Sequence, residues 1–349
     1  MRKAVIFLLI MFCSSLIFAE KTGELLQVLR PQNLEVGGNR LYVSEGAEIH
    51  VFSLKDLSLI CRFGKKGEGP GELQVNPFIA NNITEYPAYL FVQAFNKILY
   101  FNHDGNFVRE QRKVPSLFRI LPVGKNFIVN KIVPGEKQQQ ISVAAIHDAQ
   151  LKEIKELCRQ EVSTRGSNMF MAADTIQFAV YKDKVYLENS KKGFVIEVYD
   201  QTGALQETIK KEIPPLTLTD NHRNELIEDL KNDPLAAAQI KNVGSWEEYK
   251  KLLNLHWPRY SPPIRDIVVS GNRIYLQTFN TREREVEFVV LAIDGQEIKR
   301  VFLPRVKEPS LLGRLVGRGT RLFDIEEDKY YYLYENENEE VWELHVKNI

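Results

Sequence analysis

The sequence has few cysteines, no excess of charge of either sign and only one long hydrophobic run. Three of the 349 residues are cysteine, and 46 basic residues balance 46 acidic ones. This balance excludes the global attraction by which strongly basic proteins bind nucleic acid or anionic membranes. Three cysteines are also too few for a disulfide-built scaffold. With 44% hydrophobic and 26% charged residues, the composition is that of an ordinary folded protein.

The hydrophobic run lies at the N-terminus and predicts a signal peptide, residues 1–19. Two basic residues precede the apolar residues 4–12, and the small residue Ala19 follows, which is the order of parts in a secretory signal. An uncleaved anchor is one alternative, although the run is shorter than the roughly 20 residues of a spanning helix. A lipoprotein modified at Cys13 is another, disfavoured by the bulky Phe12. We therefore expect an exported protein, periplasmic or extracellular, with no membrane span after cleavage.

Sequence patterns for catalysis and for cofactor binding are missing. The six histidines show no metal-ligand spacing, and no Gly-x-Ser-x-Gly nucleophile motif occurs. The glycine-rich stretch FGKKGEGPGELQ, residues 63–74, lacks the order of a phosphate-binding loop, because its lysines precede the last three glycines. An extended segment containing Pro77 follows it, where a phosphate site needs a helix. We interpret the stretch as a structural loop and expect no cofactor, with calcium as the open alternative.

A turn followed by a short apolar strand recurs six times along the chain. The pattern is found at residues 38–43, 87–92, 124–129, 182–187, 271–276 and 328–333. Each copy is preceded by one apolar strand and followed by an alternating strand, and most copies show a further strand after that. Repeated units of four strands are typical of a β-propeller. The sequence thus predicts an all-β fold, a six-bladed β-propeller with four-stranded blades.

The two ends of the chain are predicted to share one blade. The last unit stops at Ile349 without an outer strand, and an unassigned strand is expected at residues 24–30. Pairing of these segments would close the ring and leave no bare edge. Residues 20–349 then form one domain, expected to be monomeric, with a small helical insertion at about 216–260.

The repeat and the GEGPGE stretch, residues 67–72, together carry a resemblance to a known group. The chain is similar to bacterial exported six-bladed β-propeller proteins, relatives of the NHL-repeat and TolB-like propellers, over most of residues 24–349. In that group a Gly-x-Gly-Pro-Gly-Glu stretch commonly follows the first blade. The resemblance implies a fold and an exported location, but little chemistry, since most members have no assigned activity.

The two cysteines of the expected mature chain are predicted to be unpaired. Cys61 falls in the outer strand of the first blade and Cys158 in that of the third. A whole blade separates them, which exceeds the Cα separation of about 7 Å that a disulfide can bridge.

Helix signals mark the insertion. Asp233 followed by proline predicts one helix start, and the capping box from Ser245 to Glu248 predicts another. The residues Trp246, Tyr249, Leu252 and Leu253 would share one side of that helix. They either pack on the propeller or belong to a lid over the central channel that would also carry His256.

Candidate binding residues gather on the face that carries the connections between blades. Arg119, Arg265 and Arg321 stand at equal spacing before matching turns, so they begin inner strands near the channel mouth. Arginines on this face could form paired hydrogen bonds with carboxylate or phosphate. The alternative is that they form ion pairs with neighbouring Glu and Asp. Arg305 and Arg314 lie on the same face, and the same alternative applies to them. The full set of candidates is Arg119, Arg165, Arg265, Arg318, Arg321, Trp257 and Tyr260.

Three functional hypotheses remain open from the sequence. The first is a non-enzymatic exported propeller whose loop-rich face binds a protein, peptide or anionic glycan. The second is a metal-dependent lyase or lactonase-type hydrolase with its site in the central channel. The metal ligands that the inner strands could offer are Glu35, Asn81, Gln177, Asp266 and Asp324. They occupy no common position on these strands, which counts against this second hypothesis. The third is a mainly structural subunit of an envelope complex.

Overall fold

The computed structural model describes residues 20–75, 81–136, 140–161, 164–165, 168–170, 175–213, 216–306 and 321–349. The expected signal peptide, residues 1–19, lies outside these ranges. Within them, no helix is both long enough and apolar enough to span a membrane.

Six antiparallel four-stranded sheets form the six predicted blades. Blade 1 contains β2 (Asn33–Gly37), β3 (Arg40–Glu45), β4 (Glu48–Ser53) and β5 (Leu59–Phe63). Blade 2 contains β6 (Asn82–Tyr86), β7 (Tyr89–Gln93), β8 (Lys97–Phe101) and β9 (Phe107–Arg112). Blade 3 contains β10 (Leu117–Val123), β11 (Asn126–Pro134), β12 (Gln140–His147) and β13 (Glu153–Glu161).

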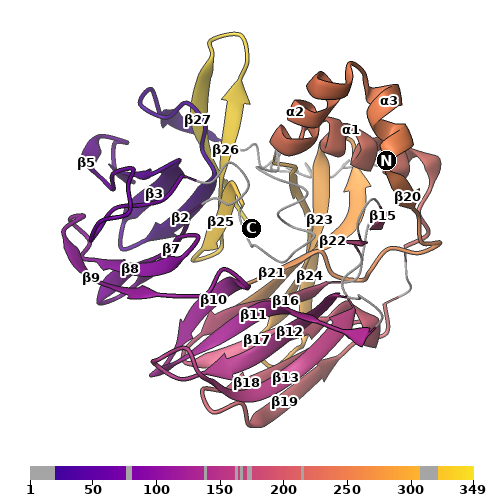
Figure 1. The fold of residues 1–349 in the computed structure, drawn as a ribbon, viewed down its shortest axis with the longest axis horizontal. Coiled ribbons are helices and arrows are strands. Elements are labelled where there is room, and N and C mark those ends of the chain that lie inside the picture. Colours follow the sequence, from indigo (N-terminus) through magenta and orange to yellow (C-terminus); the bar gives the residue numbers. More distant parts are fainter. Residues whose placement is uncertain are drawn as a thin grey trace, which may run out of the picture.

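The second half of the ring repeats this order. Blade 4 contains β16 (Ile176–Tyr181), β17 (Lys184–Asn189), β18 (Val195–Asp200) and β19 (Leu205–Lys210). Blade 5 contains β21 (Asp266–Ser270), β22 (Arg273–Arg282), β23 (Glu285–Ala292) and β24 (Glu297–Pro304). Blade 6 contains β25 (Phe323–Glu326), β26 (Lys329–Asn336), β27 (Val341–Asn348) and, from the other end of the chain, β1 (Glu20–Glu24). Figure 1 shows the blades arranged around a common centre.

The recurring turns and the central strands explain why each unit folds as a blade. At Gly38 and Asn39 both φ angles are positive, 57° and 63°, as the tightest hairpin turns require. Strands β3, β7 and β8 are buried along most of their length, because neighbouring blades cover both faces. The outer strand β9 is exposed. Apolar clusters form between consecutive blades, as between blades 1 and 2, so the core is a ring of interfaces.

The N-terminal strand closes the ring as predicted, but it lies earlier than residues 24–30. It spans Glu20–Glu24 and pairs with β27. The segment after it turns, with the Val28 N–H donating to the Leu25 carbonyl at 3.0 Å. Leu25 and Val28 are buried, whereas Leu26 and Leu29 are 64% and 72% exposed. Buried side chains spaced three residues apart are typical of a turn, whereas a strand buries every second side chain. The apolar content of this segment therefore suggests a strand where the chain turns.

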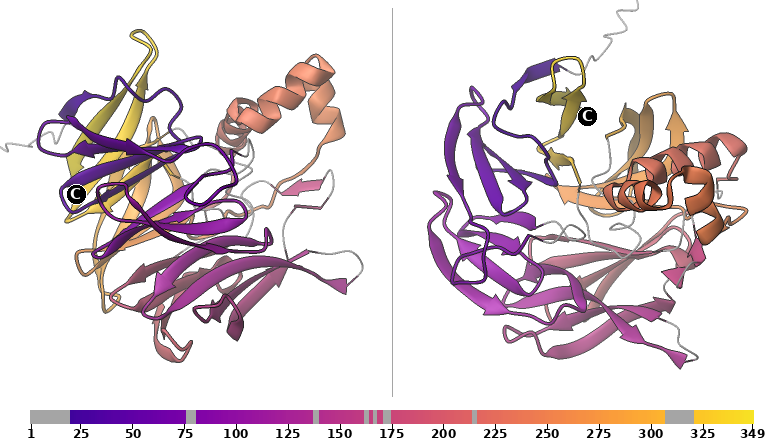
Figure 2. Two further views of the ribbon diagram at one scale, coloured as in Figure 1. Left: turned by 60° about the vertical axis from the view of Figure 1, so that its left-hand side comes forward. Right: turned by 45° about the horizontal axis from the view of Figure 1, so that its top comes forward.

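The insertion contains three helices, α1 (Asp220–Asn232), α2 (Pro234–Val243) and α3 (Trp246–Leu252). The two predicted helix starts are confirmed, whereas α1, capped by Thr219, was not predicted. Leu252 is 58% exposed, so its predicted place on the packed side is wrong. Figure 2 shows the helices standing on one face of the ring. They contact blade 5, where Arg305 pairs with Glu225 on α1 at 2.9 Å.

The two cysteines are free, which confirms the prediction. Cys158 is buried among apolar side chains between blades 3 and 4, and burial raises the pKa of its thiol to about 12. A thiol with such a pKa is a packing group and a poor nucleophile.

Candidate functional site

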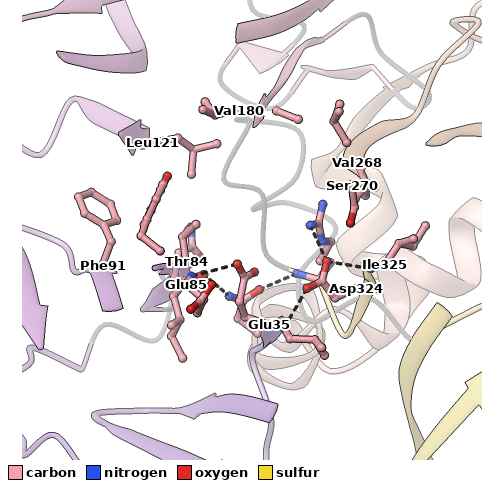
Figure 3. Close-up of a pocket in the computed structure, with 18 of the residues that line it drawn as sticks. Glu35, Thr84, Glu85, Phe91, Leu121, Val180, Val268, Ser270, Asp324 and Ile325 are labelled. Atoms are coloured by element: carbon pink, nitrogen blue, oxygen red, sulfur yellow. Dashed lines mark hydrogen bonds and ion pairs between the residues drawn. The ribbon is translucent and has the colours of Figure 1, made fainter. Parts of the chain in front are cut away.

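A cavity of about 200 Å³ lies at the centre of the ring. Residues from the inner strands of all six blades line it, and Figure 3 shows how they converge. Its charged lining residues among the described part of the chain are Glu35, Glu85, Arg119, Arg321, Asp324 and Glu326. The cavity has room for a small molecule or for one end of a larger ligand.

Arg119, on β10, presents a guanidinium group to the cavity. The side chain is 8% exposed, lies 4.6 Å from the centre of the Phe178 ring and donates to the Gln177 Oε1 at 3.3 Å. Within the described ranges it makes no ion pair. Burial lowers the pKa of Arg119 to about 10, although the nearby Asp266 carboxylate acts in the opposite direction. Arg119 therefore has unused hydrogen-bonding capacity for an anion.

Arg321, by contrast, is already paired within the protein. Its guanidinium donates to the Asp324 Oδ1 at 3.2 Å and lies 3.9 Å from the Asp266 Oδ2. Asp324 also accepts from the backbone N–H groups of Val36, at 2.9 Å, and Ile325, at 2.8 Å. This arrangement joins blades 5, 6 and 1 and leaves Asp324 little capacity for a ligand.

Glu35, on β2, is the second side chain with capacity to spare. Its Oε1 accepts from the Glu85 N–H at 3.1 Å, and its Oε2 accepts no hydrogen bond from the described residues. Figure 3 shows its carboxyl group directed toward the middle of the cavity. Burial, and then the nearby Asp324 carboxylate, raise the pKa of Glu35 well above its ordinary value. Asp324 keeps Arg321 as its partner, so the proton of this pair resides on Glu35.

The raised pKa of Glu35 predicts that stability falls as pH rises. The folded protein holds the Glu35 proton more tightly than the unfolded chain does. The protonated Glu35 therefore contributes its full stabilisation of the folded state below the ordinary glutamate pKa. This stabilisation is lost as pH rises through the higher pKa of the folded state. Glu35→Gln keeps the acceptor for the Glu85 N–H and removes this dependence. We expect urea unfolding to show the variant gaining about 1 kcal/mol relative to wild type between pH 5 and pH 8. Parallel stability curves would contradict the assignment.

Three polar side chains lock neighbouring blades together around the cavity. Each accepts from a backbone N–H of the next blade: Asp324 from Val36, Glu35 from Glu85 and Gln93 from Ile120. Gln93 also donates to the Phe118 carbonyl at 2.6 Å. Sequence reasoning missed Gln93 because it ends the second strand of its blade, where no inner-strand pattern points to it.

The structure brings together only part of the predicted candidate set. Arg119 and Arg321 line the cavity; Arg265 is buried beside Phe279, 5.5 Å from its ring centre, and is not among the lining residues. Trp257 packs with the helical cluster, and Tyr260 is 41% exposed; neither lines the cavity.

The remaining predicted arginines divide into two groups. Arg305 is paired with Glu225 and Asp229 on α1, as the alternative reading of the arginines predicted. Arg314 and Arg318 lie outside the described residues, and for Arg165 only the backbone, in β14 (Thr164–Arg165), is described. Strand β14 pairs with β15 (Asn168–Phe170), which runs parallel to β20 (Asn254–His256) of the insertion.

The glycine-rich loop is structural, as predicted. Its N–H groups already bind carboxylates of the protein: Gly69 donates to Glu72 at 2.9 Å and Gly71 to Glu110 at 3.0 Å. Lys97 completes the arrangement by donating to the Gly69 carbonyl at 2.7 Å. The backbone donors that a phosphate would need are therefore occupied.

Gly64, at the start of this loop, is expected to be irreplaceable. Its φ is +88°, and a Cβ there would lie 2.4 Å from the Ala47 carbonyl oxygen, so Gly64→Ala should cost about 2–3 kcal/mol in stability. Gly46 has a φ of +57° and open space around it, so Gly46→Ala should cost about 1 kcal/mol. Chemical denaturation of both variants measures the difference. Equal losses would show that the close approach does not matter.

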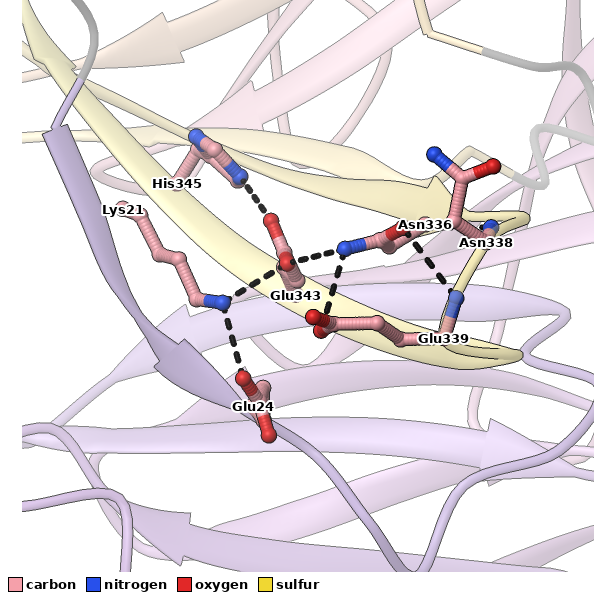
Figure 4. A network of polar contacts seen from close by, with 7 residues as sticks. All are labelled: Lys21, Glu24, Asn336, Asn338, Glu339, Glu343 and His345. Carbon is pink, nitrogen blue, oxygen red and sulfur yellow. Dashed lines mark hydrogen bonds and ion pairs between the residues drawn. The ribbon is translucent and has the colours of Figure 1, made fainter.

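The described residues offer a single group of three potential metal ligands, Glu24, Glu339 and Glu343. It lies at the β1–β27 edge, away from the channel, and Figure 4 shows that Lys21 already occupies it. The Lys21 Nζ lies 2.8 Å from Glu24 and 2.7 Å from Glu343. Within the described part of the channel, the carboxyl groups do not bring three ligand atoms together. The geometry thus gives no support to a channel metal.

Solved structures that resemble this chain share little of its sequence. The chain shares 9% identity with the Moraxella catarrhalis BamB structure (90% of this chain, 82% of the other, TM-score 0.36). It shares 9% with the Neurospora crassa Pan2 WD40 domain (94% and 95%, TM-score 0.45) and 10% with Kluyveromyces lactis Hsv2 (90% and 98%, TM-score 0.38). Likenesses with TM-scores this low carry no argument about this protein, and curated proteins give no match.

A family model gives a more specific result. The model described as DUF5128, 6-bladed beta-propeller, matches residues 21–209, which is more than half of the chain. It confirms the propeller that the sequence predicted, without assigning the chain to the NHL-repeat or TolB-like groups. The protein belongs to the DUF5128 family of six-bladed β-propellers.

Proposed function

We propose that this protein is a non-enzymatic, exported binding protein, periplasmic or extracellular, that acts as a monomer. Its central cavity holds a carboxylate group of a peptide or glycan partner that docks on the loop-rich face. The observation that carries this proposal is Arg119, a buried guanidinium that faces the cavity without an ion pair in the described part of the chain. A kinship with NHL-repeat or TolB-like propellers would be consistent with it.

The surroundings of Arg119 favour binding over catalysis. Its guanidinium lies over the Phe178 ring and donates a hydrogen bond to Gln177, so it is oriented before any ligand arrives. A carboxylate would form paired, charge-assisted hydrogen bonds there in a water-poor environment. Asp324 accepts hydrogen bonds from Arg321, from the Ile325 N–H and from the Val36 N–H of the next blade, which leaves it little capacity to act as a catalytic base.

Titration calorimetry with triglutamate and with trigalacturonate tests the proposal. We expect at least one probe to bind wild-type protein and Arg119→Gln to weaken that binding at least tenfold, since it removes the charge. Arg159→Gln is the matched control, because Arg159 lies on the outer strand of the same blade and is 63% exposed in an ion pair with Glu156. The control should change the affinity less than twofold. Binding that survives Arg119→Gln, or no binding of either probe, would refute the proposal.

A further inference from the structure

The lining of the cavity contains more acid than base. Among its described residues, four carry carboxyl groups and two carry guanidinium groups. One of those guanidinium groups, that of Arg321, is committed to Asp324. With the proton of the Glu35–Asp324 pair on Glu35, three carboxyl groups still face two guanidinium groups. A ligand that brought only a carboxylate would add to this excess of acid, which opposes its binding. The Arg119 site is therefore electrostatically incomplete for a simple anion.

Two groups in the cavity have hydrogen-bonding capacity that the protein does not use, and they are opposite in kind. The Arg119 guanidinium donates to a single amide oxygen. The Glu35 carboxyl group accepts a single backbone hydrogen bond through Oε1, and its Oε2 is free of partners from the described residues. One group comes from blade 3 and the other from blade 1, and both line the same cavity.

We propose that the occupant of the cavity is amphoteric: a free amino acid or a short peptide whose carboxylate binds Arg119 and whose ammonium group binds Glu35. This inference rests on the proposed function and narrows its ligand from any carboxylate to one that also carries an amine. The ammonium group displaces the proton of Glu35 to solvent and becomes the hydrogen-bond partner of its carboxylate, and the ligand carboxylate accepts from the unused N–H groups of Arg119. A uronate glycan has a carboxylate for Arg119 but no ammonium group for Glu35.

A set of four probes tests the inference by titration calorimetry at pH 7. L-alanyl-L-alanine carries both charges, its N-acetyl form only the carboxylate, its C-terminal amide only the ammonium, and D-galacturonate is the glycan acid. We expect the free dipeptide to bind at least tenfold tighter than each of the other three. The N-acetyl form or galacturonate binding as tightly as the dipeptide would overturn the amphoteric ligand and leave the carboxylate site standing. If no carboxylate probe bound, both proposals would fail.

Two variants assign the charges. Glu35→Gln keeps the acceptor for the Glu85 N–H and should bring the dipeptide and its N-acetyl form within threefold of one another. Arg119→Gln should weaken both of these ligands tenfold or more. Glu156→Gln, on the outer strand β13, is the control and should change the affinity for neither ligand. A dipeptide preference that persists in Glu35→Gln, with a normal thermal melt, would show that Glu35 does not bind the amine.

Discussion

Replacement of Arg321 by methionine is expected to destabilise the protein by about 3–5 kcal/mol, because it leaves buried acids without their partner. The guanidinium pairs with Asp324 at 3.2 Å and approaches Asp266 at 3.9 Å. Asp324 is 6% exposed, so water cannot replace the lost charge. Urea unfolding at pH 7 measures the effect.

Two comparisons separate the loss of charge pairing from the loss of packing. The double variant Arg321→Met with Asp324→Asn removes the stranded charge and should recover at least half of the lost stability. Arg159→Met, which breaks an exposed ion pair of the same i,i+3 spacing, should cost less than about 1 kcal/mol. If the double variant were as unstable as the single one, packing and not charge would explain the role of Arg321.

Replacement of Leu25 by alanine is expected to cost about 2–5 kcal/mol, the range for emptying a fully buried leucine site. Leu25 follows β1, is completely buried and packs against Trp342 and Leu344 of the last blade. Its N–H donates to the Trp342 carbonyl at 2.7 Å. The residue therefore anchors the N-terminal segment to the blade that it completes.

The neighbouring leucine provides the control for this prediction. Leu26 is 64% exposed, so Leu26→Ala should change stability by no more than about 0.5 kcal/mol. Thermal and urea unfolding of both variants measure the contrast. Equal effects, or a small effect of Leu25→Ala, would contradict the closure of the ring by the N-terminal segment.

The repeat made the fold predictable, and the exceptions have physical causes. Six copies of one turn-and-strand pattern determine the number of blades, because each unit buries its faces only against its neighbours. The position of β1 was mispredicted because Leu25 and Val28 are buried in a turn, whereas apolar content alone suggests a strand. Helix α1 was missed because His222, and not Glu or Gln, completes the capping box after Thr219.

The candidate site was predictable only in part. Equal spacing before matching turns placed Arg119, Arg265 and Arg321 near the channel, and two of them, Arg119 and Arg321, line the cavity, whereas Arg265 does not. No sequence pattern reveals which of them is neutralised, since that depends on Asp324 and Asp266 approaching Arg321 across blades. Trp257 was associated with the channel through its position in the insertion, yet it is partly buried against the apolar cluster of the helices.

The most direct test of the carboxylate site is the binding of triglutamate and trigalacturonate to Gln177→Glu. Gln177 Oε1 lies 3.3 Å from the Arg119 guanidinium, so the new carboxylate would occupy Arg119 from within the protein. We predict that the variant has a melting temperature equal to or above that of the wild type. Whichever of the two probes binds the wild type should bind the variant at least tenfold more weakly. Unchanged affinity in a correctly folded variant would contradict the assignment of Arg119 as the group that holds the carboxylate.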